Sequence, residues 1–209
     1  MDTPLSNRPL LIVPGLGGSG PGHWQTHWTE RFEDAEQIVQ DDWDRPDLAA
    51  WLARLRGAIE KTPDAILVGH SLGCILIAHL VQRDAHARIA GALLVAPADV
   101  DMCLGLPDCL AAFAPVPRVH LPFPSITVAS TNDPYATIRR AEDFARSWGS
   151  TFRNIGACGH INVAAGFGPW PKGERMLAEL GRTIAAERLA PPTRRLTQRT
   201  SSVALRASR

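Results

Sequence analysis

Residues 64–81 read DAILVGHSLGCILIAHLV, and this stretch decides which fold the sequence predicts. An apolar run at residues 65–68 leads into the pattern G-x-S-x-G at residues 69–73, and an apolar helical run follows. This context predicts a sharp strand-to-helix turn that holds Ser71 in a strained conformation, with flanking glycines leaving room for the close approach. Ser71 would then be a nucleophile at the N-terminus of a helix, whose dipole favours developing negative charge. The alternative is a serine that caps the helix after a glycine turn.

Short apolar runs alternate with longer amphipathic stretches along the rest of the chain, which indicates an α/β fold with a mostly parallel sheet. We expect about six strands, at residues 10–13, 37–40, 65–68, 91–96, 125–129 and 151–154. We expect helices at residues 24–32, 46–60, 72–83, 134–148 and 171–188. Because nearly every strand position is apolar or β-branched, helices should cover both faces of the sheet in a three-layer αβα sandwich. Residues 97–122 contain five prolines and predict a loop or small excursion, too short for a large lid domain.

Composition sets limits on the kind of protein. A chain of 209 residues is long enough for one core, so residues 1–190 are interpreted as a single domain. A net charge of +1 gives no reason to expect nucleic acid as a partner, and the absence of a long apolar run predicts a cytoplasmic protein outside the membrane. Residues 191–209 carry five arginines and no acid, and we interpret them as a disordered tail, with a basic arm for nucleic acid or lipid as the alternative.

The four cysteines are too few and too irregularly spaced for a disulfide scaffold or a structural zinc site. We therefore expect reduced, mostly buried thiols and no bound metal. The sequence does not predict an oligomeric state.

A serine nucleophile needs a base, and the base needs a group that orients it. After a nucleophile elbow these groups follow in the order acid, then histidine, each in a loop after a strand. Asp133 and His160 meet both conditions. Asp99 and Asp101, after the fourth strand, are rival acids, and Asp133 could instead cap a helix. The remaining histidines lack either the loop or the place in the order; they are His23, His27, His70, His79, His86 and His120.

The stretch VPGLGGSGPGHW at residues 13–24 supports two interpretations. Its glycines spell G-x-G-x-x-G after a strand, and Asp41 or Asp42 stands where a ribose-binding acid belongs, which favours an NAD(P)-dependent oxidoreductase. Alternatively, the loop supplies an oxyanion-hole N–H, with Leu16 the preferred donor and Gly15 the next, beside the N–H of Leu72.

Two further points stay open. Trp24, Trp28 and Trp170 flank loops expected to reach the site, so they could form walls of a substrate pocket or simply pack in the core. The whole constellation could also belong to a non-catalytic interaction module built on a hydrolase scaffold.

Three segments, GHSLGC, ASTNDPYATIRRAEDFARSWG and GHINVAAGFGPWPKG, resemble those of the small α/β-hydrolases grouped as the retinoblastoma-binding protein 9 or YdeN type. The resemblance runs over about residues 10–186. It implies a compact α/β-hydrolase fold. Because the chain has no long insertion to serve as a lid, we expect a small pocket and an enzyme that cleaves small esters, thioesters or amides without a cofactor. Ser71 would be the nucleophile, Asp133 the orienting acid and His160 the base. No retinoblastoma-binding motif L-x-C-x-E is present, because Leu76 stands where glutamate would be needed.

Overall fold

The computed structural model describes residues 8–102 and 108–189. Six strands in this part of the chain form one sheet in the order β2-β1-β3-β4-β5-β6, and all five neighbouring pairs are parallel. The strands are β1 Leu10–Val13, β2 Ala35–Gln37, β3 Ala65–His70, β4 Ile89–Val95, β5 Ser125–Ala129 and β6 Thr151–Asn154. The α-helices are α1 Trp24–Arg31, α2 Leu48–Lys61, α3 Leu72–Arg83, α4 Ile138–Trp148 and α5 Pro171–Leu189.

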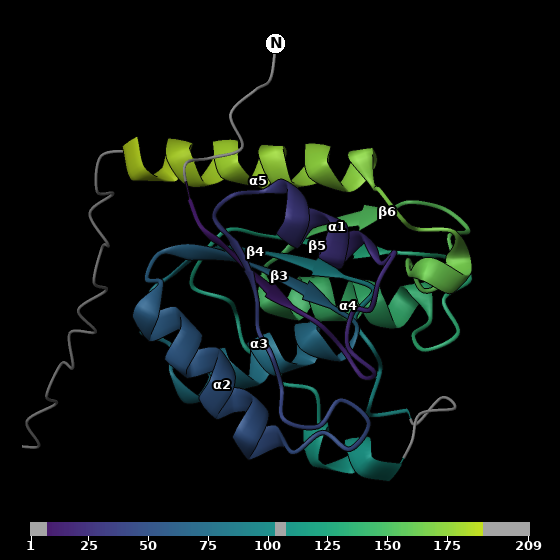
Figure 1. Cartoon of the computed structure of the whole chain (residues 1–209). Coiled ribbons are helices and arrows are strands. Elements are labelled where there is room, and N and C mark those ends of the chain that lie inside the picture. The colour runs from purple at the N-terminus through teal and green to yellow at the C-terminus, as the bar shows by residue number, and fades with distance from the viewer. Residues whose placement is uncertain (1–7, 103–107, 190–209) are drawn as a thin grey trace, which may run out of the picture.

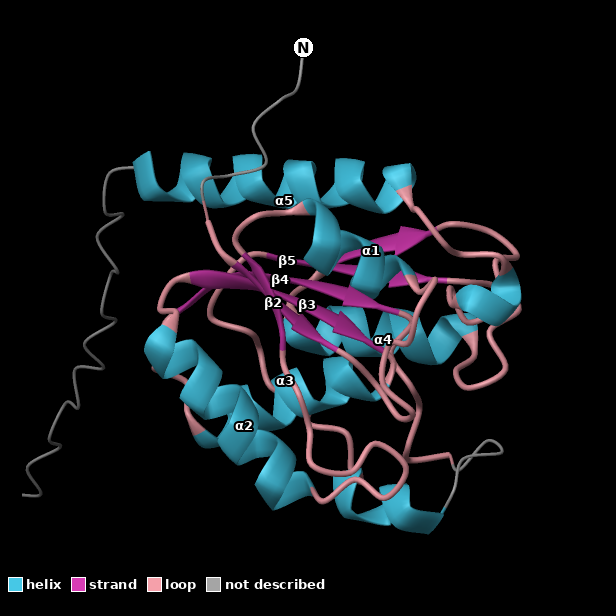
Figure 2. Ribbon diagram, in the orientation of Figure 1, coloured by secondary structure: helices cyan, strands magenta, loops and turns pink. Residues whose placement is uncertain are grey.

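Helices cover both faces of the sheet and make three layers (Figure 1). Helices α1 and α5 lie on one face, and α2, α3 and α4 lie on the other (Figure 2). Every residue of β1, β3 and β5 is buried, as their continuous apolar sequences predict. The edge strands β2 and β6 are partly exposed, so the expectation that every strand is fully covered is wrong at the two edges.

Seven of the eleven elements have an end that differs from the sequence-based expectation, and the largest differences are three residues at the end of β2 and four at the start of α4. Strand β2 was expected at residues 37–40 but runs from Ala35 to Gln37. It begins earlier because Ala35 pairs with Leu10, and beyond Gln37 only the N–H of Ile38 still bonds to β1. Helix α4 begins four residues after Pro134, because the hydroxyl of Thr137 accepts a hydrogen bond from the N–H of Arg140 and caps the helix there. Both differences come from local hydrogen bonds that hydrophobic periodicity does not register.

The described part of the proline-rich segment, residues 97–102 and 108–122, contains no strand and no α-helix, in agreement with the predicted loop. It contains the short 3-10 helix η1 Asp108–Phe113, which packs against α3. Phe113 is fully buried, and its carbonyl accepts a hydrogen bond of 2.8 Å from His79 Nε2. A second short helix, η2 Val163–Ala165, follows β6.

Some predictions fall outside the described residues. Cys103 and residues 190–209, which include the proposed tail, lie there. Cys74, Cys109 and Cys158 are free thiols, of which only Cys74 is fully buried, so the expectation of mostly buried cysteines is wrong for the other two. None of the described helices has both the length and the apolar character needed to cross a lipid bilayer.

Candidate active site

Ser71 occupies the sharp turn between β3 and α3, with φ 53° and ψ −120°. Its hydroxyl makes no capping hydrogen bond, so the alternative role as a helix cap is wrong. The flanking glycines are required by packing. A Cβ atom on Gly69 would lie 2.9 Å from the side chain of Ile77, and one on Gly73 would lie 2.1 Å from the carbonyl oxygen of Val13. The G-x-S-x-G motif is therefore a strained elbow with close backbone contacts.

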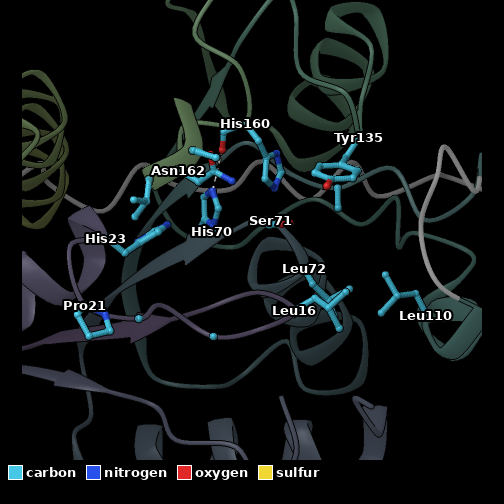
Figure 3. A pocket seen from close by; sticks show the side chains of 15 residues that line it. Leu16, Pro21, His23, His70, Ser71, Leu72, Leu110, Tyr135, His160 and Asn162 are labelled. Carbon is cyan, nitrogen blue, oxygen red and sulfur yellow. Dashed lines mark hydrogen bonds between the residues drawn. The ribbon is translucent and has the colours of Figure 1, made fainter. Parts of the chain in front are cut away.

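Asp133 and His160 are brought together from the loops after β5 and β6. Nδ1 of His160 lies 2.9 and 3.0 Å from the two carboxylate oxygens of Asp133, and both side chains are at least nine-tenths buried. The carboxylate also accepts the N–H of Tyr135 at 2.9 Å. His160 and Ser71 line the same cavity (Figure 3). The three residues selected from the sequence thus share one site.

The rival acids belong to an ion-pair cluster. Asp99 is fully buried and binds the guanidinium of Arg140 with two hydrogen bonds of 2.6 and 2.8 Å. Asp101 binds the same guanidinium at 2.8 Å. These hydrogen bonds raise the pKa of Arg140, so its charge is kept. The cluster ties the loop after β4 to α4, and neither carboxylate contacts His160.

Two further histidines lie beside His160 in tilted and edge-on contacts. The rings of His70 and His160 have centroids 4.9 Å apart, and those of His23 and His70 are 5.0 Å apart. Burial, with a smaller contribution from His160, lowers the pKa of His23 to about 4. Burial also lowers the pKa of His70 well below its usual range. Both are therefore neutral near pH 7.

The backbone of residues 158–161 is held by side chains from the loop after β5, from helix α1 and from strand β3. Two of its N–H groups donate to Ser130 Oγ at 2.8 Å and Asn132 Oδ1 at 2.7 Å. Two of its carbonyl oxygens accept hydrogen bonds from Trp24 Nε1 and His70 Nε2, both at 2.9 Å. The sequence analysis missed these supports. The available signal was that Asn132 and His70 directly precede the proposed acid and nucleophile.

The glycine-rich loop after β1 lies against the elbow. A Cβ atom on Gly15 would come within 2.9 Å of Ser71 Cβ and 3.1 Å of the nitrogen of Leu72. Leu16 and Leu72 both line the cavity. The glycines therefore allow the loop to approach the serine, as the oxyanion interpretation requires.

The cavity has a volume of about 580 Å³, within the usual range for small-molecule sites. Neither Trp24 nor Trp170 lines it, so their prediction as pocket walls is wrong. Both are buried in the core, 5.1 Å apart between ring centroids, because their large rings bury more area there. The side chains that line the cavity around Ser71 include those of Leu16, His23, Leu72, Leu110, Tyr135 and Asn162 (Figure 3). Within residues 8–102 and 108–189, no group of three or more histidine, cysteine or acidic residues could hold a metal ion.

Comparison with known proteins identifies the family of the chain. The model of the family described as "Serine hydrolase" matches residues 10–179. A protein from Pectobacterium atrosepticum described as a YdeN-like hydrolase is 37% identical, with a TM-score of 0.74 over 84% of this chain and 91% of that one. The ydeN gene product of B. subtilis is 19% identical, with a TM-score of 0.65 over 83% and 98%. RedJ, a thioesterase of Streptomyces coelicolor, is 19% identical, with a TM-score of 0.54 over 87% and 95%. No curated protein sequence matches.

The site and these matches decide between the hypotheses left open by the sequence. Of the two candidate ribose-binding acids, Asp41 forms an exposed ion pair with Arg54, and Asp42 accepts hydrogen bonds from the N–H groups of Asp44 and Arg45. The YdeN part of the resemblance is confirmed, and an oxidoreductase or a non-catalytic module does not fit the family. The chain belongs to the serine hydrolase family, within the α/β-hydrolase superfamily, and is a hydrolase.

Proposed function

We propose that the enzyme cleaves small esters, thioesters or amides through an acyl-enzyme on Ser71. The observation that carries the proposal is the pair of contacts, 2.9 and 3.0 Å, between Nδ1 of His160 and Asp133, in a cavity that Ser71 also lines. With Nδ1 occupied by a carboxylate, the other ring nitrogen, Nε2, is the one left to act as a base.

In the first half-reaction, Ser71 Oγ bonds to the acyl carbon while its proton passes to Nε2 of His160. The carbonyl electron pair moves onto oxygen and then returns, expelling the leaving group, which takes the proton from His160. A water molecule repeats these steps on the acyl-enzyme and releases the acid and free Ser71. Asp133 holds the imidazole in the required tautomer and stabilises its charged form.

The negative oxygen of the intermediate needs two donors. The N–H of Leu72 is in the first turn of α3, where backbone N–H groups have no partner within the helix. The N–H of Leu16 donates to no atom of the residues that the structure describes. These two groups are the proposed oxyanion hole, with Gly15 as the next candidate for the second donor, and loss of one donor typically costs about 3–4 kcal/mol.

The electrostatic surroundings favour this chemistry. The ring of His70 lies 4.9 Å from that of His160 and the ring of His23 lies 5.0 Å from that of His70, measured between centroids, and both histidines are neutral near pH 7 because burial lowers the pKa of each. They add no positive charge against the imidazolium that must form on His160.

A fluorophosphonate probe tests the proposal directly. Purified protein should be labelled at Ser71, as located by peptide mapping, and should hydrolyse p-nitrophenyl butyrate. Ser71→Ala should lose both properties while keeping the far-UV circular dichroism spectrum. Ser147→Ala, a matched change on α4 outside the cavity, should keep both. A folded wild-type protein that resists labelling, or equal labelling of Ser71→Ala, would overturn the proposal.

A further inference from the structure

The cavity has different walls on the two sides of Ser71. His160 and Asn162 lie on one side, and Leu16, Leu72 and Leu110 lie together on the other (Figure 3). We call these three leucines the leucine wall. Leu72 and Leu110 belong to the hydrophobic core on the α2–α3 face of the sheet, and Leu16 packs against that core. The leucine wall is therefore continuous with the interior of the protein.

Leu110 is held in place by η1. Only 3% of Leu110 is exposed, and Phe113 at the end of the same short helix is fully buried. The ring of Phe113 lies edge-on to Trp51, with centroids 5.9 Å apart, and its carbonyl is bonded to His79. Since η1 is anchored at both its side chains and its backbone, Leu110 forms a fixed end to the leucine wall.

The reaction itself orients the substrate between these walls. The leaving group must take a proton from His160, so it lies on the side of His160. The acyl chain, on the opposite side of the carbonyl carbon, then extends across Ser71 over the leucine wall. The proposed oxyanion donors are the backbone N–H groups of Leu16 and Leu72, so the carbonyl oxygen lies beside the same wall.

We infer that the leucine wall is the acyl-binding subsite, that it takes an uncharged, apolar acyl chain, and that Leu110 limits the length of this chain. The inference rests on the proposed function. Apolar side chains stabilise such a chain because its surface and their own are removed from water.

Charge in the cavity agrees with this assignment. Of its histidines, His23 and His70 are neutral near pH 7, since burial lowers the pKa of each. Among the cavity-lining residues that the structure describes, none is aspartate, glutamate, lysine or arginine. A carboxylate or ammonium group on the acyl chain would lose hydration against the leucine wall without gaining an ionic partner.

The test measures kcat/KM of the full chain for p-nitrophenyl esters of acetate, butyrate and octanoate, of succinate as its monoester, and of glycine. Butyrate should exceed the succinate and glycine esters by about 100-fold, since an unpaired charge is costly to desolvate. Leu110→Ala should raise the octanoate-to-butyrate ratio by roughly tenfold, and Leu110→Phe should lower it, since one methylene in an apolar pocket changes discrimination by about that much or more. A ratio measured on one preparation does not depend on the fraction that is folded.

Leu177→Ala is the matched control, because Leu177 is as buried as Leu110 but lies in α5 outside the cavity. It should leave the ratio unchanged. Charged esters cleaved within tenfold of butyrate, or an unchanged ratio in both Leu110 variants, would overturn the subsite while Ser71 labelling still supported the proposed function. Failure of both labelling and hydrolysis in folded protein would overturn the proposed function and the subsite together.

Discussion

Gly73→Ala tests whether the elbow works only when α3 packs directly on the loop after β1. In the native backbone an alanine Cβ at this position would lie 2.1 Å from the carbonyl oxygen of Val13 and 2.8 Å from that of Pro14. Real Cβ atoms do not approach closer than about 3 Å, and both contacts are backbone atoms that no rotamer change can move. The loop and the helix must therefore separate by about 1 Å.

The separation affects stability and catalysis by different amounts. Overpacking of this kind costs about 1–3 kcal/mol of folding free energy, which for a chain of this size lowers Tm by about 2–12 °C. The same movement carries the N–H of Leu16 away from the oxyanion position beside Leu72. Loss of that donor should lower kcat by about 100- to 1,000-fold.

Thermal unfolding followed by circular dichroism and hydrolysis of p-nitrophenyl butyrate measure the two effects. Gly57→Ala is the matched control, since a Cβ on Gly57 meets open space within α2. This change should raise stability by about 0.5–1 kcal/mol, the usual gain from replacing a helical glycine, and leave kcat unchanged. If Gly73→Ala had the same Tm and the same kcat as Gly57→Ala, the close packing of the elbow would not matter for function, and the reasoning would be wrong.

Three further predictions concern single side chains. Asp133→Asn should lower kcat by about 10⁴ with little change in Tm, as measured by ester hydrolysis and thermal unfolding, because the imidazole loses its orienting carboxylate. Asp99→Asn should affect stability and not catalysis. It should lower the free energy of unfolding, measured in urea, by about 1–3 kcal/mol because the guanidinium of Arg140 loses a buried charged partner, and kcat should stay near that of the wild type. The pKa of His23 is lowered from its ordinary value of 6.5 to about 4 in the folded protein, so between these pH values the unfolded chain binds more protons than the folded one. The contribution of neutral His23 to the free energy of unfolding is therefore fully present above pH 6.5 and is lost as the pH falls toward 4. His23→Asn keeps an acceptor for the N–H of Gln25 but does not titrate, so its urea midpoint should change less between pH 7 and pH 5 than that of the wild type, and an equal change would contradict this assignment.

The sequence predicted the order of strands and helices because burial on both faces leaves a continuous apolar signature. For β1, β5, β6 and α3, the predicted first and last residues are those that the structure shows. The apolar pattern was less informative at the ends of elements, where hydrogen bonds decide which residue is the first or the last. Ile38 was predicted to be part of a strand because it is apolar and β-branched, but the ladder with β1 stops at Gln37. Thr137 caps α4 although Pro134 is also an acceptable first helical residue.

The proposed catalytic residues could be selected from the sequence because chemistry restricts them to loops at one edge of the sheet, in one order. The walls of the cavity could not. Leu110 lies in a segment without periodicity, and its place at the cavity depends on how η1 packs against α3. Likewise, G-x-G-x-x-G fits two kinds of anion site, and the sequence does not show that Gly15 lies against Ser71, 56 positions along the chain, as the oxyanion interpretation requires.

The tryptophans that the sequence suggested as pocket walls support the site from the core. Ile161, next to His160, has φ 49°, a conformation that is strained for a β-branched residue and costs about 1–3 kcal/mol. Its carbonyl accepts a hydrogen bond from Trp24 Nε1, and the ring of Trp24 packs edge-on against Trp28 and Trp170. Rotating Ile161 into a relaxed conformation would move this carbonyl and leave a buried indole N–H without its partner, which itself costs about 1–3 kcal/mol. The two costs are similar, so the buried tryptophan cluster offsets the strain that positions His160.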